Sequence, residues 1–126
     1  RMARRKASRA ETGPAERGEA VLIRAGEPLE GLETMRRLRR LVDREPRPGE
    51  LAGGPARLCQ ALAIDRTLNG VPFGAGELDL LSGQSIEDRD VVRSPRIGVS
   101  YAGEAAAWLL RFSVKGNPHV SRPRPG

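Results

Sequence analysis

The chain has 126 residues, the size of one domain, and its 15 glycines and 10 prolines predict many turns around a small core. Its net charge of +6, from 22 basic and 16 acidic residues, indicates either a polyanionic partner such as DNA or RNA or a basic protein without one. One cysteine and one histidine exclude an intrachain disulfide, a cysteine-based metal site and a multi-histidine zinc site, and no apolar run is as long as a membrane span.

The first residues, RMARRKASRAE, are basic and have no apolar stretch behind them, which is not typical of a secretory signal. We expect residues 1–11 to be a basic disordered extension, followed by a domain over 12–121 and a tail over 122–126. The expected location is the cytoplasm, in association with the nucleoid. No cofactor, metal or membrane partner is expected.

The first ordered element is predicted at residues 19–25, EAVLIRA. Three consecutive branched apolar residues, Val21 to Ile23, are typical of a buried strand. Arg24 follows them directly. A charge at the end of a buried strand must either be paired or lie exposed at a site.

Two helices are predicted next. The first runs from Pro28 to about Asp43. Its apolar stripe is Leu32, Met35, Leu38 and Leu41, and its other face carries Arg36, Arg37, Arg39 and Arg40, with Glu33 placed to pair with Arg37. We interpret these arginines as a solvated face. The second helix covers 54–64, with Pro55 in its first turn and Leu58, Leu62 and Cys59 on its buried side. Cys59 has no nearby histidine and is interpreted as a core residue.

The rest of the chain predicts short strands. Asn69-Gly70 marks a turn, and a weakly alternating strand is expected at 77–83. Residues 91–106 indicate a strand broken at Pro95, its resumption and a short helical turn, and LLRFSV at 109–114 is the last strand. The fold class expected is therefore a small mixed α+β fold.

Four segments go beyond a generic pattern: TGPAERG (12–18), GEAVLIRAGEPLEGLETMRRLR (18–39), GPARLCQALAID (54–65) and PRIGVSYAGEAAAWLLRFSVKGNPHVS (95–121). In this order and near this spacing, they together resemble one family, the alkyladenine or 3-methyladenine DNA glycosylases of the single-domain mixed α/β type. The resemblance implies a curved antiparallel sheet with short helices, truncated at the N-terminus. It also implies hydrolysis of the N-glycosidic bond of alkylated purines in double-stranded DNA after base flipping.

The resemblance also assigns roles to residues of this chain. Arg24 matches the arginine that positions the attacking water and orients a catalytic glutamate. Ile97 matches the residue whose backbone carbonyl accepts a hydrogen bond from that water. Gly98, beside it, and Arg57 match positions that contact DNA. The alternative for Arg24 is a structural ion pair with Glu27 or Glu104, and His119 is expected to be structural.

The family's general-base glutamate, intercalating tyrosine and base-gripping aromatic residues lie in an N-terminal half that this sequence does not match. RMARRKASRAE has no Tyr, His or Asn, and Glu11 is followed by Thr-Gly-Pro instead of the expected Glu-x-Tyr. We therefore expect this polypeptide to be inactive alone, with a missing N-terminal half as a candidate partner. The alternatives are an inactive DNA-binding remnant that uses Arg57, the basic tails and Arg36–Arg40, and an unrelated basic nucleic-acid-binding domain.

Overall fold

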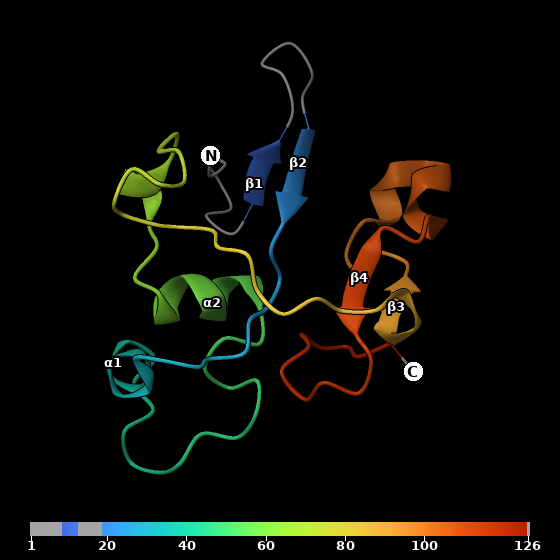
Figure 1. Cartoon of the computed structure of the whole chain (residues 1–126). Helices are drawn as coiled ribbons and strands as arrows, with labels where there is room; N and C mark the ends of the chain where they lie inside the picture. The colour runs from blue at the N-terminus through green and yellow to red at the C-terminus, as the bar shows by residue number, and fades with distance from the viewer. Residues whose placement is uncertain (1–8, 13–18, 126) are drawn as a thin grey trace. The chain divides into compact units, whose positions relative to one another are not determined.

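The computed structural model describes residues 9–12 and 19–125, which form two compact units. The first contains the described residues up to Ser82 together with Pro118–Arg122, and the second contains Gly83–Asn117 and the last residues of the chain. Each unit combines short helices with one antiparallel pair of strands (Figure 1). The α+β class predicted from the sequence is confirmed. Most of the predicted basic extension, 1–11, lies outside the described residues.

The strands of the first unit are β1 (Arg9–Thr12) and β2 (Glu19–Leu22). They pair antiparallel, with Arg9 opposite Leu22 and Thr12 opposite Glu19. The expected buried strand at 19–25 is shorter and is not buried: Val21 is 55% exposed, because β2 is paired only with β1 in the described part of the chain. Of the three branched residues, Ile23 packs against the core.

Helices α1 (Leu32–Leu38) and α2 (Pro55–Ala61) are both shorter than predicted. Gly31, at φ 68°, precedes α1, and this left-handed conformation prevents the helix from starting at Pro28. Two residues after the last residue of each helix, a non-glycine residue takes the left-handed conformation, Arg40 at φ 56° and Ala63 at φ 53°. The amides of Leu41 and Ile64 then bond back five residues, to Arg36 and Cys59. Both ends are Schellman motifs built without glycine.

The core of the first unit is small. Ala52, Leu58 and Ala61 form a buried cluster, against which Ile23 and Met35 pack. Leu51 and Ile64 are also buried, whereas Leu62, predicted to be buried, is 42% exposed because it lies at the end of α2. Cys59 is half-buried on α2. A short 3-10 helix, η1 (Arg66–Leu68), follows, with the Asp65 side chain accepting a hydrogen bond from the Thr67 amide at its start.

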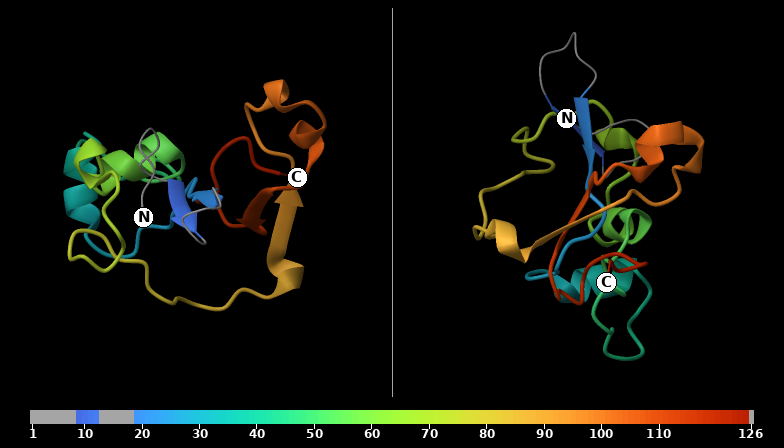
Figure 2. Two further views of the ribbon diagram at one scale, coloured as in Figure 1. Left: turned by 90° about the horizontal axis from the view of Figure 1, so that it is seen from above. Right: turned by 90° about the vertical axis from the view of Figure 1, so that its right-hand side faces the viewer.

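The second unit is built on β3 (Val91–Ser94) and β4 (Arg111–Val114), paired antiparallel with Val91 opposite Val114. Figure 2 shows this ladder, formed separately from that of β1 and β2. The 3-10 helices η2 (Asp88–Asp90) and η3 (Ser100–Ala107) precede the two strands, and Gly103 kinks η3.

Two predicted strands are absent from the described residues of this region. Residues 77–83 are irregular, and the strand does not resume after Pro95. Neither segment has a ladder partner, which a strand requires. No helix in the described part of the chain is long and apolar enough to span a membrane.

Candidate functional site

Arg24 lies in the extended stretch after β2, and its side chain is held by the far end of the chain. Its Nε donates a hydrogen bond to Oγ of Ser121 at 3.3 Å, across 97 positions of sequence. Ser121 is 4% exposed, so its hydroxyl is a fixed acceptor. The half-buried Arg24 is therefore anchored at Nε, as expected for a charge that follows an apolar run.

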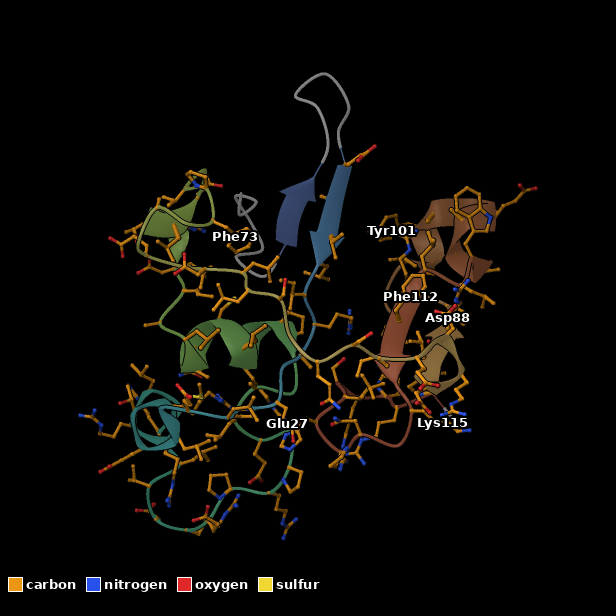
Figure 3. The ribbon with its side chains drawn as sticks, in the orientation of Figure 1. Glu27, Phe73, Asp88, Tyr101, Phe112 and Lys115 are labelled. Atoms are coloured by element: carbon orange, nitrogen blue, oxygen red, sulfur yellow. The ribbon has the colours of Figure 1, made fainter. Side chains whose placement is uncertain are left out.

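The terminal nitrogens of the Arg24 guanidinium make no hydrogen bond or ion pair with any residue that the structure describes. The alternative ion pair with Glu27 is not found among the described residues. The carboxylate of Glu27, which is labelled in Figure 3, instead faces Nε2 of His119 at 3.7 Å. The other candidate, Glu104, belongs to the second unit. The two terminal NH2 groups of the anchored guanidinium thus remain for an anionic partner, and one N–H of each can bind a carboxylate in the bidentate geometry that arginine offers.

Arg57 lies in the first turn of α2 and is exposed. Its Nη1 donates to the backbone carbonyl of Gly49 at 3.1 Å. One contact to a carbonyl leaves the charge of the guanidinium uncompensated. Together with burial, which is the larger cause, this charge lowers the pKa of Arg39 from its ordinary value. The structure therefore presents Arg57 as an exposed cation, the chemistry needed to contact a phosphate.

The arginines of the predicted solvated face are divided between two roles. Arg36 donates to the carbonyls of Leu41 and Arg44, and Arg39 donates to those of Glu50 and Leu51. These two side chains hold the loop that follows α1, so their interpretation as solvated charges is wrong. Arg37 and Arg40 are exposed. Arg37 donates to Oγ1 of Thr34 at 3.3 Å, and no contact with Glu33 is found among the described residues.

Ile97 and Gly98 lie in the second unit, in the irregular segment between β3 and η3. Ile97 is 40% exposed. Gly98 has φ 72°, the left-handed region that glycine adopts without strain, and a Cβ at this position would have no atom within 4 Å. Gly98 therefore serves the backbone turn, and the space beside it is open to a ligand.

The four predicted site residues are thus distributed over both units, with Arg24 and Arg57 in the first and Ile97 and Gly98 in the second. Sequence reasoning missed Ser121 and Gly49, which hold Arg24 and Arg57. No local pattern marks either residue, since a serine and a glycine in loops are ordinary. The described residues contain no group of three or more His, Cys, Asp or Glu side chains placed to hold a metal ion.

Comparison with known proteins identifies the class to which this α+β chain belongs. The model of the methylpurine-DNA glycosylase family matches residues 8–118. A protein of Methanocella arvoryzae described as a 3-methyladenine DNA glycosylase is 47% identical over 108 residues, which are 85% of this chain and 52% of that protein. The human DNA-3-methyladenine glycosylase is 44% identical over 111 residues, 82% of this chain and 37% of its own length.

A relative from Streptomyces avermitilis, described in the same terms as that of Methanocella, is 46% identical over 112 residues, 86% of this chain and 50% of the relative. The chain belongs to the methylpurine-DNA glycosylase family. It spans about half the length of the microbial relatives it matches and a smaller share of the human protein.

Proposed function

We propose that this chain forms part of a DNA-3-methyladenine glycosylase, a hydrolase that acts on the N-glycosidic bond of alkylated purines. Family membership over residues 8–118 supports the proposal, as do relatives named for this activity. Its substrate is double-stranded DNA with a damaged base. That base must leave the base stack before a protein group can reach the glycosidic bond. The reaction takes place on DNA in the cytoplasm, and its site needs neither cofactor nor metal.

The anchored guanidinium of Arg24, with its two terminal NH2 groups left for a carboxylate, carries the proposal. A catalytic glutamate supplied by the part of the family domain outside this chain accepts one hydrogen bond from each of these NH2 groups. The positive charge keeps that carboxylate ionised, since an opposite charge within about 4–6 Å lowers its pKa. The carboxylate then accepts a proton from water as the water oxygen bonds to the sugar C1′ and the bond to the base breaks.

Ile97 and Arg57 complete the role of this chain. The backbone carbonyl of Ile97 accepts the second hydrogen of the water, which fixes the direction of its lone pair. Arg57 contacts a phosphate of the DNA backbone, and the turn at Gly98 lets the strand approach closely. A net charge of +6 adds a sequence-independent attraction to the duplex.

The second candidate function is DNA binding without catalysis by residues 1–126 alone. The sequence favours it for this polypeptide, because RMARRKASRAETGP does not contain the Glu-x-Tyr pattern that the resemblance leads us to expect. Loss of a general base costs about 10²–10⁴-fold in rate. The polypeptide alone is therefore expected to bind DNA weakly and release no base.

One pair of assays tests both candidates. The polypeptide 1–126 is compared with a chimaera in which residues 12–121 of this chain replace the 108-residue matched segment of the Methanocella relative. Single-turnover release of 3-methyladenine is expected from the chimaera and not from the polypeptide. A chimaera that folds and binds DNA but releases no base would contradict the proposed activity. Release by the polypeptide above a protein-free control would contradict its assignment as inactive alone.

A further inference from the structure

The segment Pro118–Arg122 belongs to the first unit, although the residues on both sides of it belong to the second. We call it the return segment. Two side-chain contacts join it to the stretch after β2. Arg24 bonds to Ser121 at 3.3 Å, and Glu27 faces His119 at 3.7 Å. The earlier residue of one stretch meets the later residue of the other, so the two stretches run antiparallel.

The return segment also approaches the loop that holds Arg57. Gly49 has φ 85°, and a Cβ built there would lie 3.4 Å from the carbonyl oxygen of Pro118. The carbonyl of the same glycine accepts the hydrogen bond of Arg57. The return segment therefore bonds to Arg24 directly and lies beside Gly49, the residue that holds Arg57. All of these residues belong to the first unit.

We propose that Ser121 is a positioning residue for Arg24, and that the return segment is the element that sets the direction of the Arg24 guanidinium. The inference rests on the proposed function, in which Arg24 meets the catalytic carboxylate. Arginine has a long side chain with several rotatable bonds. A hydrogen bond at Nε restricts the rotation of the planar guanidinium and so narrows the directions in which both terminal nitrogens can point. A buried serine supplies that contact without adding charge.

Loss of the Ser121 hydroxyl frees the Arg24 side chain to rotate while its charge stays in place. Misplacement of a positioning group by about 1 Å costs up to about 10²-fold in rate. Ser121→Ala in the chimaera is therefore expected to slow single-turnover excision by about 10- to 100-fold, with DNA affinity unchanged. Ser121→Thr, which keeps a hydroxyl at the same position, is expected to restore most of the rate.

A double-mutant comparison separates positioning from a merely structural role. In a chimaera that already carries Arg24→Ala, Ser121→Ala is expected to cause no further loss, because the group it positions is gone. A structural role would instead lower the rate by the same factor in both backgrounds and lower the melting temperature. Nitrogen-15 NMR of the Arg24 Nε–H group reports on the contact directly. In Ser121→Ala, the Nε–H signal is expected to shift, and its proton is expected to exchange faster with solvent.

The outcomes distinguish this inference from the proposed function. If Arg24→Ala slows excision and Ser121→Ala leaves both the rate and the Nε–H signal unchanged, Ser121 is not a positioning residue and the proposed function stands. If Arg24→Ala itself leaves excision unchanged, the mechanistic role of Arg24 is wrong and the inference that depends on it fails too. An equal loss from Ser121→Ala in both backgrounds also overturns the inference.

Discussion

The carboxylate of Glu50 accepts hydrogen bonds from both terminal nitrogens of Arg44, at 2.7 and 2.8 Å. The backbone amide of Arg47 donates to the same carboxylate at 2.7 Å. The bonds from Arg44, and after them the bond from Arg47, lower the pKa of Glu50 from its ordinary value of 4.5 to about 2. The loop after α1 is thus closed by a carboxylate that stays ionised in acid.

A carboxyl titration of Glu50 tests this relationship. Because its pKa is lower in the folded chain than in the unfolded chain, Glu50 contributes stability above about pH 4.5, and the contribution is lost as the pH falls toward about 2. Carbon-13 NMR of the Glu50 carboxyl should give a midpoint near 2 in the chimaera, and Arg44→Gln should move it back toward 4.5. A Glu50 midpoint near 4.5 without any substitution would contradict the contact.

Gly53→Ala should destabilise the same loop. The amide of Gly53 bonds to the Gly49 carbonyl at 3.0 Å, and a Cβ on Gly53 would lie 2.3 Å from that oxygen. Since the clash is with backbone, we expect a loss of about 1–3 kcal/mol in the free energy of unfolding of the chimaera. The control is Gly83→Ala, where a Cβ would have no neighbour within 4 Å. Equal stability of the two variants would show that the backbone at Gly49 and Gly53 is not close-packed.

Arg57→Ala should weaken DNA binding and leave the chemical step nearly intact. Arg57 is an exposed cation, so its loss removes one phosphate contact. The slope of log Kobs against log salt should fall in magnitude by about 1. Arg44→Ala is the matched control, because the charge of Arg44 is already compensated by Glu50. A slope that is the same in Arg57→Ala and in the unsubstituted protein would remove Arg57 from the DNA interface.

The polypeptide 1–126 alone should self-associate. Large apolar side chains of the second unit are exposed, among them Tyr101 at 84%, Phe112 at 58% and Trp108 at 57%. Tyr101 and Phe112 are labelled in Figure 3. Exposed apolar surface and two-stranded ladders favour association between copies. Sedimentation should show a mean mass that rises with concentration, and Trp108→Ser should reduce the rise. A monomer at every concentration, with a cooperative thermal transition, would show that the polypeptide is a self-standing domain.

The sequence predicted those parts of the fold that depend on residues close together in the chain. Pro55 marks the start of α2, and the strand predicted at 109–114 contains β4. The ends of both helices were missed because Arg40 and Ala63 take a left-handed conformation that usually indicates glycine. The prediction of a strand at 77–83 was wrong, because a weak alternation of apolar and polar residues does not by itself provide a neighbouring strand to pair with.

The site was predictable only in part. Resemblance to the family singled out Arg24 and Arg57, and the structure adds what holds them. The contact between Arg24 and Ser121 spans 97 positions, so no sequence window contains both residues. The roles of Arg36 in α1 and of Arg39 just after it could not be predicted either, because both donate to carbonyls of a loop whose path the sequence pattern does not predict.

The central claim is that Arg24 acts on the chemical step of base excision, and single-turnover excision by the chimaera tests it most directly. Loss of one preorganised donor costs about 2.7–4 kcal/mol of barrier, or about 10²–10³-fold in rate. Arg24→Ala should show a loss of this size, and Arg24→Lys should not restore the rate, because an ammonium lacks the planar donor pair. DNA affinity and melting temperature should stay nearly unchanged in both variants. Near-normal excision by Arg24→Ala, or a loss that follows unfolding alone, would contradict the claim.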